Sequence, residues 1–146
     1  MKKIASIMLF MAAMFSGNAG AQSALRAVFG YSTFYSAQTG QPYVETYLSF
    51  DAWTMNFVEQ ANGTYRATAE VVIVARQGDS VCYVKKYDLN SPTVGSLEEL
   101  DFSFIDMQRF SLKNGIYDLE LTIGDKNSPE PAATVNEKLV LNYDDV

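Results

Sequence analysis

The chain has 146 residues, with 11 Lys and Arg against 17 Asp and Glu, so its formal net charge is −6. An acidic chain of this kind is repelled by nucleic-acid phosphates and by anionic lipid surfaces, so we expect no nucleic-acid partner. No histidine is present, which excludes a Ser-His-Asp triad, a Cys-His pair and an imidazole ligand for zinc.

The first 21 residues have the pattern of a secretory signal peptide. Lys2 and Lys3 precede an apolar run at 4–15, and Ala19-Gly20-Ala21 supplies the small residues after which a signal peptidase cleaves. The run is shorter than the roughly 20 apolar residues of a membrane span, although an uncleaved anchor is the alternative. We expect cleavage after Ala21. Loss of the two lysines then leaves 22–146 as a single exported domain of net charge −8, without a membrane span.

Beyond residue 24, apolar and polar side chains alternate with the period of β-strands. The segment 43–50 ("YVETYLSF") directs Val44, Leu48 and Phe50 to one face, which we expect to line the core. Asn62-Gly63 predicts a hairpin turn before the longest alternating segment, 65–74. That segment is apolar on both faces from position 71 onward, as expected of a central strand.

The two residue types that occur once are both expected in the interior. Trp53 lies close in sequence to Phe50, Met55 and Phe57, which favours burial; an exposed sugar-stacking residue is the alternative. Cys82, in the apolar run "SVCYV", is expected to be a small buried side chain. As the only cysteine it cannot form an intrachain disulfide.

The stretch "LKNGIYDLELTIGD" (112–125) predicts a crossing between two sheets. Asn114-Gly115 supplies a tight reversal because both residues tolerate positive φ. Tyr117 follows at the start of the next strand. There it is expected to act as a structural tyrosine corner whose hydroxyl bonds to upstream backbone. With about seven or eight strands and turns at short intervals, the chain is predicted to be all-β, an immunoglobulin-like antiparallel β-sandwich.

Two similar segments, "YVETY" and "YVKKY", each place a tyrosine pair on one strand face. The pairs are Tyr43 with Tyr47 and Tyr83 with Tyr87. If the two strands are neighbours, Glu45 and Lys85 between the tyrosines would pair across them, and we expect an outer sheet face held by aromatic contacts. The alternative is a flat binding surface for a sugar ring or for a partner protein.

No catalytic, cofactor or metal site is expected. The loop 124–131 ("GDKNSPEP") has oxygen-bearing side chains at alternate positions, beginning with Asp125, but it lacks the glycine and the closing acid of a calcium loop. Whether it binds an ion is left open, with a solvated loop favoured. Carboxylates such as Asp106 or Asp118 are the only candidates for an enzyme.

The segments "FYSAQTGQPYVETYLSFDAW", "NGTYRATAEVVIVARQGDSVCYVKKYDL" and "FIDMQRFSLKNGIYDLELTIGDKN" together resemble the N-terminal β-rich region of exported Bacteroidetes proteins that contain a GWxTD motif. The motif itself is absent, since Trp53 lies in "DAWTM", so no functional residue is carried over. The resemblance implies a location in the envelope of a Gram-negative bacterium. It also implies a shortened relative or the front portion of a longer protein.

The sequence therefore favours an exported, non-catalytic module in the periplasm or at the cell surface that binds an envelope protein. A carbohydrate-binding module that uses its exposed Tyr or Trp residues on a glycan is the alternative.

Overall fold

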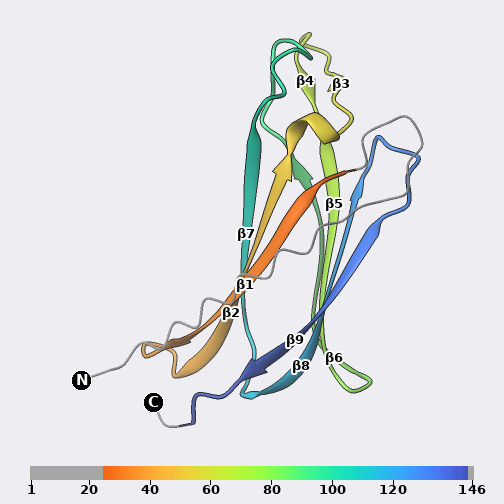
Figure 1. The fold of residues 1–146 in the computed structure, drawn as a ribbon. Helices are drawn as coiled ribbons and strands as arrows, with labels where there is room; N and C mark the ends of the chain where they lie inside the picture. Colours follow the sequence, from red (N-terminus) through yellow and green to blue (C-terminus); the bar gives the residue numbers. More distant parts are fainter. Residues whose placement is uncertain (1–24, 145–146) are drawn as a thin grey trace.

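A computed structural model describes residues 25–144, which are built almost entirely of antiparallel strands (Figure 1). The strands are β1 (Ala27–Ser36), β2 (Gln41–Asp51), β3 (Val58–Glu59), β4 (Tyr65–Arg66), β5 (Thr68–Gln77), β6 (Ser80–Asn90), β7 (Ser103–Ser111), β8 (Gly115–Asp125) and β9 (Ala133–Leu141). A 3₁₀ turn, η1 (Ala52–Thr54), follows β2. The predicted all-β class is confirmed, whereas the signal peptide predicted at 1–21 lies outside the described residues.

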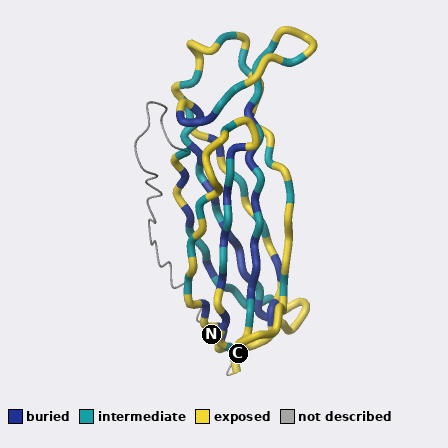
Figure 2. The backbone as a smooth tube through the Cα atoms, turned by 90° about the vertical axis from the view of Figure 1, so that its right-hand side faces the viewer, coloured by how far each residue is buried: buried dark blue, intermediate teal, exposed yellow. Residues whose placement is uncertain are grey.

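The long strands form two sheets around a common core, in a sandwich-like arrangement. One sheet has the order β1-β2-β7 and the other the order β6-β5-β8-β9, while β3 and β4 form a separate small hairpin. Buried residues follow the strands along their length (Figure 2). The largest fully buried side chains come from both sheets: Val44, Leu48, Phe50, Val71, Ile73, Leu119, Leu121, Ile123, Leu139 and Leu141.

The alternating pattern of the sequence explains this core. Val44, Leu48 and Phe50 point inward from β2, as predicted, and β2 has a hydrogen-bonded neighbour on each side. Val71 and Ile73 do the same from β5, whose place between β6 and β8 matches its apolar character on both faces. Full burial of such a side chain contributes about 1.5–3 kcal/mol, so these interior strands hold the two sheets together.

The sheets also contact each other along both pairs of edge strands. On one side β7 faces β6, where the ring of Phe110 stacks on that of Tyr83 with centroids 4.0 Å apart. On the other side β1 faces β9, where the hydroxyl of Tyr31 donates to the carbonyl of Lys138 at 3.0 Å. Polar groups that face inward on edge strands discourage further strand pairing at those edges.

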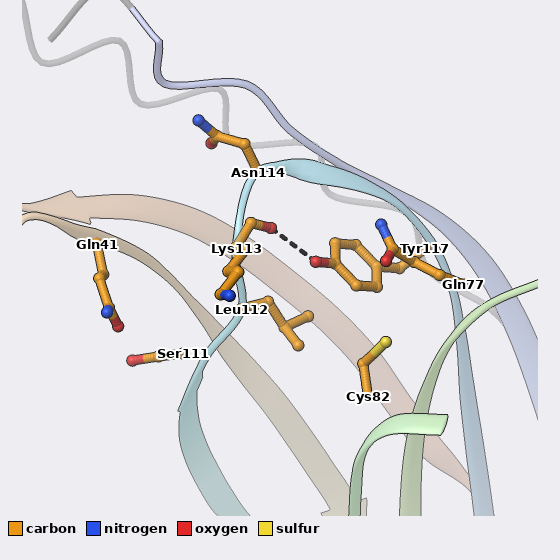
Figure 3. Close-up of a pocket in the computed structure, with 8 residues that line it drawn as sticks. All are labelled: Gln41, Gln77, Cys82, Ser111, Leu112, Lys113, Asn114 and Tyr117. Atoms are coloured by element: carbon orange, nitrogen blue, oxygen red, sulfur yellow. Dashed lines mark hydrogen bonds between the residues drawn. The ribbon is translucent and has the colours of Figure 1, made fainter. Parts of the chain in front are cut away.

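The chain crosses between the sheets from β7 to β8, and Tyr117 lies at this crossing. Its side chain is almost fully buried, and its hydroxyl donates to the carbonyl of Lys113 at 2.7 Å, the bond expected of a tyrosine corner (Figure 3). Gly115 leaves room for Gln77, because a Cβ there would clash with the Gln77 side-chain amide, while the ring of Tyr117 at 3.4 Å would be in ordinary contact.

The expectation that Asn114 adopts positive φ is wrong, since no non-glycine residue among 25–144 does so. Its side chain instead ties the crossing to the end of the chain. The Asn114 amide donates to Asp144 at 2.7 Å, and its carbonyl accepts from the Tyr143 backbone N–H at 3.0 Å. These bonds fix the crossing without a left-handed residue.

The hairpin turn predicted at Asn62-Gly63 is present between β3 and β4. Gly63 has a φ of +80°, which L side chains rarely adopt. The side-chain oxygen of Asn62 accepts from the backbone N–H and the hydroxyl of Thr64, at 3.1 and 2.7 Å. Local turn chemistry therefore accounts for both residues.

Within 25–144, no helix is long and apolar enough to cross a membrane.

Candidate functional site

The outer face of the β1-β2-β7 sheet, which we call the β2 face, has an apolar strip that is open to solvent. Val28 and Ile105 flank Ser49 across the three strands, and Tyr47 and Met107 lie in the next row beside Gly30. Ile105 is 72% exposed, the largest value among the large hydrophobic residues. The apolar and aromatic members that define the β2 face are Val28, Tyr47, Trp53, Ile105 and Met107.

Trp53 lies near this strip, just after the end of β2, and the expectation that it is buried is wrong: it is 50% exposed. The reason is the η1 turn, whose other residues, Ala52 and Thr54, take the buried positions. The Thr54 hydroxyl donates to the carbonyl of Asp51 at 2.7 Å and accepts from the backbone N–H of Arg26 at 2.9 Å. Trp53 is thus held outward by a hydrogen-bonded turn, with the Arg26 guanidinium 5.9 Å from its ring centre.

Tyr43 and Tyr47 lie on the β2 face, as the alternation predicts, but their polar and aromatic surfaces are occupied. The ring of Tyr43 stacks on Phe34 at 5.2 Å, and the guanidinium of Arg109 lies 4.9 Å from its centre. The hydroxyl of Tyr47 donates to the buried carboxylate of Glu45. A sugar ring would have to displace these contacts in order to stack on Tyr43.

Two ion pairs set the electrostatics of the β2 face. Arg109 binds Glu45 through both Nε and Nη2, while Arg26 Nε lies 3.8 Å from Asp51 Oδ2. The hydrogen bond from Tyr47, followed by Arg109, holds the pKa of Glu45 below its ordinary value. The same bond to Glu45 raises the pKa of Tyr47 to about 12. Both groups therefore keep their neutral-pH protonation states over a wide pH range.

Tyr83 and Tyr87 share a face, as predicted, but that face turns toward the opposite sheet and not outward. The hydroxyl of Tyr87 donates to Asp106 at 2.5 Å. Burial of the hydroxyl raises the pKa of Tyr87, and the hydrogen bond to Asp106 raises it by a smaller amount. The conditional Glu45–Lys85 pair does not form, because β2 and β6 belong to different sheets. Lys85 instead donates to Gln108 at 2.5 Å, so the inner face of "YVKKY" joins the two sheets.

The outer face of the β6-β5-β8-β9 sheet carries more charged side chains than the β2 face. Ion pairs cross it at Arg76–Glu120, Lys86–Glu70 and Lys138–Asp118, with N–O distances of 3.6, 3.2 and 2.7 Å. Its exposed apolar residues form small groups: Ile116 and Val140 pair across β8 and β9, and Val84 on β6 pairs with the buried Val74 on β5. The ion pairs of Arg76 and Lys138 lie between these two groups. Small exposed apolar groups are ordinary on a protein surface, whereas a larger strip indicates contact with another molecule.

A polar hollow of about 430 Å³ opens near the tyrosine corner (Figure 3). It is lined by Gln41, Gln77, Cys82, Ser111, Leu112, Lys113, Asn114 and Tyr117. The expectation that Cys82 is buried is wrong: its thiol is exposed. The edge strand β6 bulges there, since Arg76 pairs with Val81 while Ala75 pairs with Tyr83, and the skipped residue is Cys82.

Asp125 is a structural residue. It is buried, its Oδ2 accepts from the Asn56 backbone N–H at 2.7 Å, and its Oδ1 accepts from that of Asn127 at 2.9 Å. Both carboxylate oxygens are thus used to join the β8–β9 loop to the segment after η1. In the part of the chain that the structure describes, no three His, Cys, Asp or Glu residues are grouped so as to hold a metal ion.

The carboxylates considered for catalysis are both engaged. Asp106 accepts from Tyr87 and Gln108, and Asp118 pairs with Lys138 at 2.7 Å. The residues missed from the sequence are Ile105 and Met107 on β7. Their signal is the alternation within 103–111, where Phe104, Asp106, Gln108 and Phe110 face inward and residues 105 and 107 face outward.

Comparison of the chain with models of protein families, with curated proteins and with solved structures gave no match.

Proposed function

We propose that this chain is an exported, non-catalytic module that binds another protein of the bacterial envelope through the β2 face. The observation that carries the proposal is the apolar strip of Val28, Ile105 and Met107. The outward-facing Trp53 lies beyond the polar row of Arg26, Asp51 and Ser103 that borders this strip. Trp, Tyr, Met and Arg are enriched in protein interfaces, and Trp, Tyr and Arg supply most of their binding energy. The β2 face combines these residue types on a hydrogen-bonded sheet.

The proposal also includes an immunoglobulin-like fold and an exported location, each of which is supported by a different observation. An immunoglobulin-like sandwich is favoured by the β7–β8 crossing and by the hydroxyl bond of Tyr117 to Lys113. Export is favoured by the pattern of residues 1–21. The resemblance to the N-terminal region of exported Bacteroidetes GWxTD-containing proteins supports a location in a Gram-negative envelope. The proposal includes no catalytic step, because the acids considered for catalysis, Asp106 and Asp118, are already bound to neighbouring side chains.

Site-specific photo-crosslinking in intact cells tests the function. A photoreactive phenylalanine analogue replaces Ile105 on the β2 face, and a matched variant carries it at Val84, an exposed position on the opposite outer face. We expect an adduct of defined mass at position 105 and none at 84. Equal yields of adduct at the two positions, or none at either, would contradict the proposal.

Carbohydrate binding is a second candidate function, and the exposure of Trp53 is the observation that favours it. Arg26 lies beside the ring, Asp51 forms an ion pair with Arg26, and Ser103 donates a hydrogen bond to Asp51, so the three offer hydrogen-bond donors and acceptors to a sugar. A glycan array tests this candidate with Trp53→Ala and, as the control, Tyr43→Ala. If Trp53 is the stacking residue, only its removal abolishes binding; an array without signal discards the candidate.

A further inference from the structure

The two ion pairs of the β2 face expose their partners unequally. The side chain of Arg109 is 59% exposed against 11% for Glu45, and that of Arg26 is 55% exposed against 33% for Asp51. On the opposite outer face, Lys86 and Glu70 are similarly unequal at 64% and 38%, but no acid of its three ion pairs is as buried as Glu45. The two guanidinium groups, that of Arg109 most clearly, are therefore the more exposed charges of the β2 face, although the whole chain is acidic.

Both guanidinium groups retain hydrogen-bond donors. A guanidinium has five N–H donors, and Arg109 uses its Nε and Nη2 on Glu45. The side chain of Arg26 makes no hydrogen bond to any residue among 25–144, because 3.8 Å exceeds hydrogen-bond length. Each arginine can thus accept a carboxylate from outside, in the bidentate geometry that the planar guanidinium favours.

The spacing of the two arginines defines the length of a partner segment. Their acidic partners, Asp51 and Glu45, are six residues apart on β2, or about 20 Å at 3.3 Å per residue. Arg26 and Arg109 lie on opposite sides of β2, two strand spacings or roughly 10 Å apart. A diagonal of about 22 Å joins them, which crosses β2 at Ser49 and Tyr47, with Ile105 and Met107 beside it on β7.

We propose that the partner contributes an extended protein segment with two acidic residues separated by about six residues, the intervening apolar side chains packing on Ile105 and Met107. This inference rests on the proposed function of the β2 face. A second copy of the exported chain is disfavoured, because it would bring like guanidinium groups and two net charges of −8 together. A basic segment would be repelled by the same two arginines.

Selection from a library of random 12-residue peptides displayed on phage tests the inference. Peptides are selected on the secreted protein and counter-selected on Ile105→Asn, which removes the apolar contact without adding charge, so that only binders of the β2 face remain. We expect acidic residues at both ends of an apolar centre. In anisotropy titrations with a selected peptide, Arg26→Gln weakens binding at least tenfold and Arg109→Lys weakens it less. Lys86→Gln, on the opposite face, leaves it unchanged.

Arg26→Gln is the informative variant because its side chain carries no hydrogen bond whose loss would unfold the chain, which circular dichroism can verify. Selected peptides that are neutral or basic, or a selection that yields none, would overturn the inference. If photo-crosslinking gives an adduct at position 105 but the selected peptides show no acidic preference, the proposed function stands and only this inference is rejected. If there is neither an adduct nor an acidic preference, both the proposed function and the inference are rejected. Self-association detected by analytical ultracentrifugation and abolished by Ile105→Lys would assign the face to a second copy instead.

Discussion

Replacement of Tyr117 by phenylalanine isolates the bond that pins the β7–β8 crossing. The change removes only the hydroxyl, which donates to the carbonyl of Lys113 at 2.7 Å from an almost fully buried ring. A hydrogen bond contributes about 0.5–1.5 kcal/mol net, and an acceptor left without a partner in a buried site adds to the loss. We expect Tyr117→Phe to lower the free energy of unfolding by about 1–3 kcal/mol.

Tyr31→Phe is the matched control for this measurement. Its hydroxyl also donates to a backbone carbonyl, that of Lys138 at 3.0 Å, but this bond is exposed, so water can replace the lost partner. We expect a loss below about 1 kcal/mol. Urea unfolding followed by circular dichroism at pH 7 gives both values. A Tyr117→Phe loss no larger than that of Tyr31→Phe would refute the role assigned to the tyrosine corner.

Three further predictions concern stability and accessibility. Asp125→Ala should lower the free energy of unfolding by about 2–4 kcal/mol, because two backbone N–H groups lose a charged acceptor, while EDTA should leave the wild-type melting temperature unchanged. The stabilisation that Tyr47 gives over Tyr47→Phe should be constant from about pH 5 to 9. It should decline as pH falls through the lowered pKa of Glu45, and also as pH rises from 10 towards the raised pKa of Tyr47, about 12, when urea midpoints are measured across this range. Cys82 should react with a maleimide in native buffer at a rate comparable to that of the urea-unfolded chain, and strong protection would contradict its exposed position.

The sequence predicted the features that depend on short-range chemistry. Alternation placed Val44, Leu48 and Phe50 in the core, and Asn62-Gly63 formed the expected hairpin turn. The local motif at Tyr117 produced the expected hydrogen bond, since donor and acceptor are only four residues apart. In each case the physical cause acts within a few residues and is therefore visible in the sequence.

The features that the sequence did not predict depend on sheet order. A period of two shows that Tyr83 and Tyr87 share a face, but only the position of β6 opposite β7 shows that this face is the inner one. Glu45 pairs with Arg109, 64 positions away, because β7 and not β6 adjoins β2. The exposure of Trp53 could not be predicted from the strand alternation, because Trp53 lies in a 3₁₀ turn, where successive side chains do not point to alternate sides.

The central claim, that a partner covers the β2 face in the cell, is tested most directly by cysteine accessibility. In a Cys82→Ser background, single cysteines replace Ile105 and Val84, and a small maleimide is applied to intact cells and to the purified protein. Coverage of the β2 face predicts that the residue at 105 is labelled far more slowly in cells than after purification, while the one at 84 is labelled equally in both. Equal labelling of position 105 in the two preparations would contradict the account.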